Sequence, residues 1–212
     1  MDNFPEEWLQ QSKNKLERHG FRVFIADHTM EARQILERLV TEFAPTSASY
    51  GDSMTLRNTD ILEYLAQQSS IRFYDGFQPD MPREQRWEIR RQGMTADLFL
   101  TGINAVCADG SLYWVDMVGN RIAPIAFGPR HVILVAGINK ITPTPEEARK
   151  RLQQIAPLNA KRHPGFKTPC MVTGTCHDCN SPDRLCNAYL TMARSYPKHR
   201  ISVILIREEA GL

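Results

Sequence analysis

Blocks of apolar residues with two different periods alternate along the chain and predict helices and strands in turn. The segment Ala32 to Phe43 places apolar residues at the i, i+3, i+4, i+7 spacing of a helix that buries one face. The runs His131 to Ala136 and Ile201 to Ile206 are continuously apolar, as in strands covered on both faces. Shorter segments predict more strands at Phe21–Ala26, Ser47–Tyr50, Ile71–Tyr74 and Leu98–Thr101, and more helices at Glu6–His19, around Ile61–Leu65, from Pro82 to Gly93, and at Pro145–Ile155.

Strands that alternate with helices indicate the α/β class. We expect a three-layer arrangement, with a mostly parallel sheet between helices, because crossovers between parallel strands are right-handed. Asp109-Gly110, between the apolar residue Val106 and the run Leu112–Val115, predicts a hairpin and hence an antiparallel element. We expect one domain over residues 1–212.

Composition is ordinary for a soluble globular protein, with 42% hydrophobic and 24% charged residues. No run of about 18 apolar residues is present, so no membrane span is expected. The first residues are acidic and carry no apolar stretch after a basic one, which argues against a secretory signal. The expected compartment is therefore the cytoplasm, where thiols stay reduced.

Four of the five cysteines lie close together near the C-terminus with the spacing C-x5-C-x2-C-x6-C: Cys170, Cys176, Cys179 and Cys186. In a reducing compartment this group favours a metal site over disulfides or free thiols. Thiolate sets suit an iron–sulfur cluster or zinc. The first three cysteines approach the plant-type ferredoxin spacing, whereas zinc ribbons use two C-x2-C pairs, so we expect an iron–sulfur cluster with zinc as the alternative. His177 could replace one ligand or be exposed.

The segment around these cysteines is basic. Residues 161–200 contain seven Lys and Arg and two acids, in a chain whose net charge is +2. Nearby cations lower thiol pKa values and favour the ligand form. The other interpretation is a solvated basic surface. Nucleic acid is not expected, because the rest of the chain is net acidic and has no binding motif. We expect residues of about 160–195 to form a Cys-rich loop insertion.

Polar residues follow four of the predicted strands, and ligands of open α/β sheets collect at the carboxyl ends of strands. Backbone amides beside Ser53 and Thr55 could cradle an anion, or Ser53 could simply cap a helix after a Gly-Asp turn. Arg121 could clamp a carboxylate or phosphate with Lys140 as a second cation, or both could be exposed. The candidate substrate-binding residues are Gly51, Ser53, Thr55, Asn104, Asn120, Arg121, Asn139 and Lys140.

No nucleophile–base pair is evident. The motifs G-x-S-x-G, G-x-G-x-x-G and the Walker loop are absent. Cys107 lies on a predicted strand and is interpreted as a small buried side chain. Catalytic residues therefore stay unknown, and whether the chain is an enzyme stays open.

These segments together resemble a known family. TGINAVCADGSLYWVDMVGNRIAPIAFGPRHVILVAGINKI (Thr101–Ile141) resembles the signature of LUD-domain proteins, the lactate-utilisation protein C family. TPCMVTGTCHDCNSPDRLCN (Thr168–Asn187) resembles the cysteine-bearing branch of that family. The resemblance implies a ribose-5-phosphate isomerase/CoA-transferase-like fold. It also implies a link to bacterial oxidation of L-lactate to pyruvate, in a system with iron–sulfur proteins.

Two departures limit what the resemblance implies. Many members have a second glycine where this chain has Asp52, which weakens a simple phosphate loop. The chain also lacks an evident counterpart of the catalytic glutamate of CoA transferases, so that activity is not expected from the fold.

Three functions follow as hypotheses. The first is an accessory or electron-transfer component of L-lactate oxidation, with a four-Cys metal site and iron–sulfur lactate-oxidation subunits as partners. The alternatives are a stand-alone enzyme that binds a small carboxylate or phosphate, and a regulatory module, each with a structural zinc. A homodimer is compatible with all three.

Overall fold

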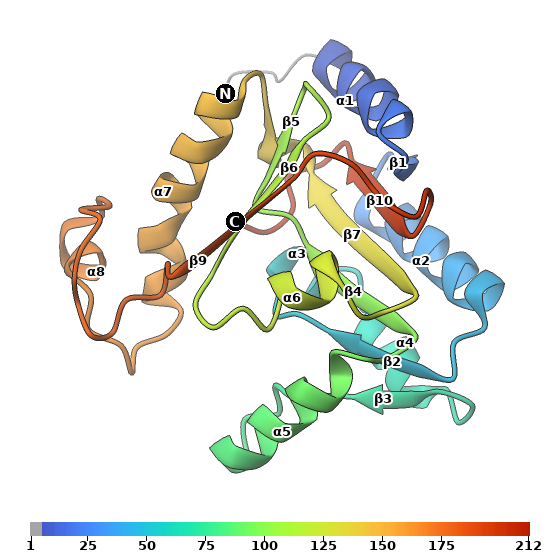
Figure 1. The fold of residues 1–212 in the computed structure, drawn as a ribbon, viewed down its shortest axis with the longest axis horizontal. Helices are drawn as coiled ribbons and strands as arrows, with labels where there is room; N and C mark the ends of the chain where they lie inside the picture. Colours follow the sequence, from blue (N-terminus) through green and yellow to red (C-terminus); the bar gives the residue numbers. More distant parts are fainter. Residues whose placement is uncertain (1–5) are drawn as a thin grey trace.

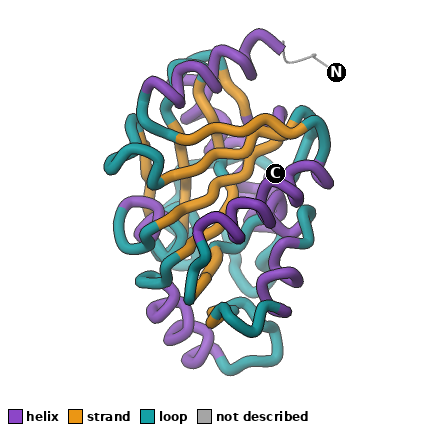
Figure 2. Tube along the Cα trace, turned by 90° about the vertical axis from the view of Figure 1, so that its right-hand side faces the viewer, coloured by secondary structure: helices purple, strands orange, loops and turns teal. Residues whose placement is uncertain are grey.

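A six-stranded parallel sheet forms the centre of the protein, in a computed structural model that describes residues 6–212 (Figure 1). The strand order is β1-β10-β7-β4-β2-β3. These strands are β1 (Arg22–Ala26), β2 (Ser47–Tyr50), β3 (Arg72–Tyr74), β4 (Leu98–Gly102), β7 (His131–Gly137) and β10 (Ile201–Ile206). The sheet lies between outer layers, which confirms the predicted three-layer, mostly parallel α/β class (Figure 2).

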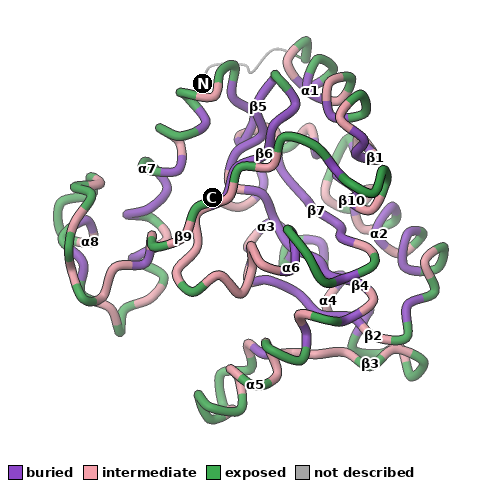
Figure 3. The backbone as a smooth tube through the Cα atoms, in the orientation of Figure 1, coloured by how far each residue is buried: buried purple, intermediate pink, exposed green. Residues whose placement is uncertain are grey.

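The central strands are buried on both faces, as their continuous apolar runs predict (Figure 3). Successive side chains of a strand point to opposite faces, so each strand contributes side chains to two hydrophobic cores. On one face Leu100 and Ile133 pack in a cluster with residues of α2 (Thr29–Phe43), α3 (Met54–Arg57) and α4 (Ile61–Gln67). On the other, Phe99 and Leu134 pack with α1 (Glu6–Arg18), α6 (Ile122–Ala126) and a second sheet.

The second sheet has the strand order β8-β5-β6-β9. Its strands are β5 (Ala105–Cys107), β6 (Leu112–Asp116), β8 (Ile141–Thr142) and β9 (Ala188–Met192). The predicted hairpin is confirmed, since β5 and β6 pair antiparallel around Asp109-Gly110. Trp114 of β6 is fully buried, and its indole Nε1 donates to the Gly102 carbonyl at 2.8 Å. This bond ties the second sheet to the end of β4.

The structure differs from the sequence-based expectation mainly in the C-terminal third. Helix α7 (Pro145–Lys161) runs past the predicted end at Ile155 and contains Pro157. The cysteine segment is not a loop throughout, because it contains α8 (Pro169–Thr173) and leads into β9, which pairs antiparallel with β6. Helix α8 lies beside α7 at one edge of the molecule (Figure 1).

The remaining elements are short. Helix α5 (Arg83–Gly93) begins after Pro82 as expected, and a 3₁₀ turn, η1 (Ile138–Lys140), follows β7. Within residues 6–212 no helix combines the length and the apolar character needed to cross a lipid bilayer.

Candidate functional site

A cavity of about 550 Å³ opens where β2, β4 and β7 end. These three strands are neighbours in the parallel sheet, so the residues that follow them meet at one edge. Further parts of the wall come from the end of β6, from α5, from the second half of α7 and from Leu185 and Cys186 of the cysteine segment. Phe77, His163, Phe166 and the C-terminal Leu212 complete it. Ser53, Asn104, Asn120, Arg121 and Lys140 of the candidate set line this cavity.

The wall is strongly basic. Six of its residues are Lys or Arg and two are Asp: Arg83, Arg86, Arg90, Arg121, Lys140 and Arg162, with Asp52 and Asp116. Both aspartates already have partners. Asp52 pairs with Arg57 at 3.0 Å and Arg162 at 3.4 Å. Asp116 accepts hydrogen bonds from the backbone amides of Met117 and Arg121. With six cations against two carboxylates, the cavity wall has an excess of positive charge.

Arg121 is held by neutral groups. Its Nη2 donates to the Val115 carbonyl at 2.6 Å and to Asn104 Oδ1 at 3.1 Å. Burial is the largest cause that lowers the pKa of this guanidinium and Arg162 adds to it, while Asp116 and Asp52 act in the opposite direction. No carboxylate within residues 6–212 forms a salt bridge with it. One edge of the guanidinium is thus fixed, while Nε and Nη1 stay available for a bidentate anion.

Glycine at position 51 is required by this arrangement. A Cβ atom there would collide with the Cγ atom of Arg121 and would lie 2.8 Å from the Thr101 hydroxyl. Gly51 itself does not line the cavity. Its missing side chain lets the arginine cross the end of β2.

Lys140 is almost fully buried, with 4% of its surface exposed. Its Nζ donates to the Thr55 hydroxyl at 2.5 Å, and that hydroxyl donates to the Ala210 carbonyl at 2.9 Å. Burial is the main cause that lowers the pKa of Lys140 to about 7, with Arg151 and Arg121 adding to it. Thr55 does not line the cavity but positions the lysine that does.

Ser53 and Asn139 hold local structure. The Ser53 hydroxyl accepts from the Leu56 amide at 3.3 Å, so Ser53 caps α3, which was the second interpretation of this segment. Asn139 lies outside the cavity lining and bonds the backbone of Ala210 and Gly211. It fixes the C-terminal tail beside Lys140.

Comparisons with known proteins agree with this fold. A family model described as the LUD domain matches residues 9–206. The chain belongs to the LUD-domain family. A crystal structure of a DUF162 family protein from Deinococcus radiodurans is similar to it, with a TM-score of 0.56 and 13% sequence identity over 95% of this chain and 97% of the other. At that identity the likeness shows the fold alone. A search of curated proteins gave no match.

Sequence reasoning missed the side of this LUD domain's cavity formed by α5. Arg83, Arg86 and Arg90 all line it, together with Trp87. Arg90 donates from Nε to the Gly76 carbonyl, while Arg86 Nε is buried without a hydrogen-bond partner among the described residues. The spacing i, i+3, i+7 places these arginines on one face of a helix and was the available signal. Nothing local shows that this face covers a cavity.

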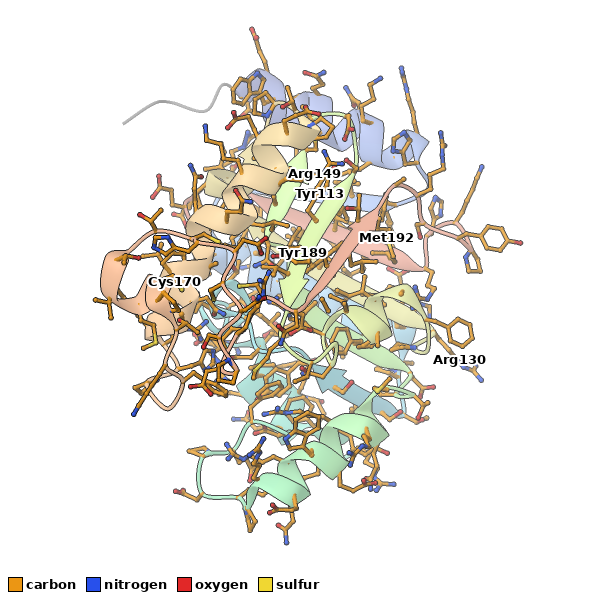
Figure 4. All side chains as sticks on the ribbon, turned by 60° about the vertical axis from the view of Figure 1, so that its left-hand side comes forward. Tyr113, Arg130, Arg149, Cys170, Tyr189 and Met192 are labelled. Carbon is orange, nitrogen blue, oxygen red and sulfur yellow. The ribbon has the colours of Figure 1, made fainter. Side chains whose placement is uncertain are left out.

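The four clustered cysteines of the LUD domain are free thiols, and Cys107 is also unpaired. Cys170 is buried and lies on α8, at the opposite side of the molecule from Arg130 (Figure 4). Cys176, Cys179 and Cys186 are half-buried. Burial raises the pKa of the Cys186 thiol, the neighbouring Arg184 acts in the opposite direction, and the three other thiols add to the rise.

The four-thiolate metal site stays a prediction. Among residues 6–212 no group of three or more His, Cys, Asp or Glu side chains is arranged to hold a metal ion. Arg184 instead organises the segment, since it donates to the carbonyls of Cys179 at 2.7 Å and Cys186 at 2.9 Å. The thiol donors of this segment are of the type that soft metals prefer.

Proposed function

We propose that this LUD domain binds a small organic anion, a carboxylate or a phosphate, in the cavity at the ends of β2, β4 and β7. The observation that carries the proposal is a pair of cations in one cavity wall, the half-buried Arg121 and the buried Lys140, neither of which forms a salt bridge with a carboxylate among the described residues. Burying charge without a counter-charge is costly, so such a wall favours an anionic ligand. In keeping with its family, we place this binding in lactate-utilisation-type metabolism in the cytoplasm.

A binding titration of the full chain tests the proposal. L-lactate, pyruvate, inorganic phosphate and ribose 5-phosphate would be titrated by calorimetry into the wild type and into Arg121→Gln. A hydrogen bond to a charged group contributes about 1.5–3 kcal/mol, so the variant should bind the preferred anion roughly ten to a hundred times more weakly. The loss should be larger at low salt.

Arg130→Gln is the matched control. Arg130 is 83% exposed at its side chain and does not line the cavity. The Arg130→Gln variant should bind the anion as the wild type does. Equal affinity of wild type and Arg121→Gln would refute the assignment of the pocket, and no binding of any of the four anions would refute the proposed function.

We also propose a second candidate function, metal binding by the cysteine segment, with an iron–sulfur cluster ahead of zinc and electron transfer as the use. It is supported by four free thiols in one short segment, and by the position of Cys186 in the wall of the anion cavity. Binding would require the Arg184-held segment to rearrange. Iron, sulfide and zinc analysis of anaerobically purified wild type, Cys176→Ser and Cys107→Ser tests it. Equal metal content in all three, or none, would count against it.

A further inference from the structure

Lys140 occupies an environment that suits a reactive amine. The side chain is buried at the end of β7, lines the cavity and has one hydrogen-bond acceptor among residues 6–212, the Thr55 hydroxyl. The described chain offers its ammonium no carboxylate. Lysines that only hold structure in a protein interior are normally paired with an acid, so this side chain calls for another account.

The surroundings disfavour the charged form of this amine. Arg151 and Arg121 both act on Lys140 with like charge, and burial adds the largest effect, so its pKa falls to about 7. Arg151 is itself fixed by a bond from Nε to the Asn139 carbonyl at 3.2 Å. A large fraction of Lys140 is therefore a neutral amine near neutral pH, which is the nucleophilic form.

The neighbouring groups complete a site for a particular class of substrate. Arg121 is fixed by Asn104 and Val115 with part of its fork free, so it can hold an acid group of a ligand in the same cavity. Lys140 lines the same cavity, so its amine can meet the remainder of that ligand. A group that a neutral amine attacks is a carbonyl carbon, so the wall fits a small anion that also carries a carbonyl.

We propose that Lys140 forms an imine with the carbonyl carbon of a 2-oxo acid bound in this cavity. The inference rests on the proposed anion binding and names the substrate class of the same site. The amine nitrogen adds to the carbonyl carbon and gives up one hydrogen, which the carbonyl oxygen takes up as the carbon–oxygen double bond becomes a single bond. The resulting carbinolamine loses its hydroxyl together with the second amine hydrogen as water. No electrons are transferred, and the step reverses by hydrolysis.

Thr55 is a positioning residue in this scheme. Its hydroxyl accepts from Lys140 and donates to the Ala210 carbonyl, so it holds the amine against the C-terminal tail. Gly211 leaves the space that this requires, since a Cβ there would lie 2.5 Å from the Thr55 hydroxyl and 3.3 Å from Lys140 Nζ. Thr55→Val should lower the amount of imine formed but leave anion binding at Arg121 largely intact.

Reductive trapping tests the proposal. The full chain would be incubated with pyruvate, or with 2-oxobutanoate, and sodium cyanoborohydride, and then analysed by intact mass and peptide mapping. We expect one reduced adduct, located on Lys140, with a yield that rises as pH increases through about 7. Lys140→Arg and Lys140→Gln should give no adduct. Lys150→Arg, which changes an exposed lysine, should give the wild-type amount.

Binding of the same 2-oxo acids, measured by calorimetry without reductant, separates imine formation from anion binding. Binding without an adduct on Lys140 would overturn the imine and leave the anion site standing, as would an adduct that persists in both Lys140 variants or spreads over exposed lysines. Absence of binding by any of the anions tested would overturn both. Circular dichroism spectra of the two Lys140 variants must match the wild type, and the variant that meets this criterion decides the outcome.

Discussion

Replacement of Lys140 by methionine should change how the stability of the protein depends on pH. Methionine has a similar length and no charge, so the variant removes the buried ammonium and keeps most of the volume. Lys140 is 4% exposed, and its pKa falls from 10.5 to about 7 in the folded protein. The unfolded chain titrates at the ordinary value.

The sign of the effect follows from proton binding. Between about pH 7 and pH 10.5 the unfolded state holds a proton that the folded state has released, so the free energy of unfolding of the wild type rises with pH. Below about pH 7 both states are protonated, and the cost of the buried charge is fully present, on the order of 5 kcal/mol at about 1.4 kcal/mol per unit of pKa. Above pH 10.5 the cost has disappeared.

Urea unfolding at pH 7 and pH 9 measures this contribution. Lys140→Met should be more stable than the wild type at pH 7, and the difference should shrink by about 2 kcal/mol at pH 9. Loss of the hydrogen bond to Thr55 lowers the variant's stability equally at both pH values, so the change in the difference is the informative quantity. Lys150→Met, at an exposed site, should follow the wild type at both pH values.

One result would refute the reasoning. If the stability difference between wild type and Lys140→Met is the same at both pH values, the ammonium is not disfavoured by its surroundings, and the neutral-amine chemistry loses its physical basis. Other titrating groups are common to both proteins and cancel from the comparison.

Three further variants probe the packing around the site. Gly51→Ala places a Cβ against the stem of Arg121 and should destabilise the protein by about 1–3 kcal/mol in urea unfolding. Gly165→Ala is the control, because a Cβ at that position meets no atom within 4 Å. Equal effects of the two substitutions would contradict the close approach of Arg121 to Gly51. Trp114→Phe leaves the carbonyl at the end of β4 without its buried donor and should cost about 1–3 kcal/mol in the same assay; an unchanged stability would show that the bond is dispensable. Burial raises the pKa of Cys107 to about 11, so its thiol should react slowly with Ellman's reagent in the folded protein. The folded Cys107→Ser variant should therefore show as many fast-reacting thiols as the wild type. The loss of one fast-reacting thiol would contradict the burial of Cys107.

The central sheet was predictable because its signal is local. Strands β2 (Ser47–Tyr50) and β10 (Ile201–Ile206) match the predicted bounds residue for residue. Burial on both faces requires a continuous apolar run in β7 and β10, and a short run of that kind between turn residues is visible in the sequence itself.

Strand β9 was not predictable in the same way. Its residues, Ala188–Met192, alternate between half-buried and exposed, and none is fully buried. It is a strand because it pairs with β6, whose residues Leu112–Asp116 lie far away in the sequence. A pairing between such distant segments leaves no periodic signal strong enough to outweigh the neighbouring turn residues.

The candidate site also contains residues that the sequence predicts and residues that depend on tertiary packing. Arg121 and Lys140 could be proposed from sequence because they follow strands, and the carboxyl ends of neighbouring strands meet in space. Arg86, Arg90 and Arg162 could not, because their place in the wall depends on how α5 and α7 pack over the sheet edge. The metal prediction used the spacing of the cysteines, the expected compartment and the nearby basic residues, and none of these determines whether four thiols converge on one point.

The cavity wall is drawn from segments between Asp52 and Leu212, and from both sheets. No part of the chain shorter than this can reproduce it, so the unfolded protein has no counterpart of the site. Any ligand of the cavity must therefore stabilise the whole fold, by about 2.7 kcal/mol when its free concentration is about a hundred times its dissociation constant. Thermal unfolding thus becomes a screen for the natural ligand that requires no knowledge of the reaction.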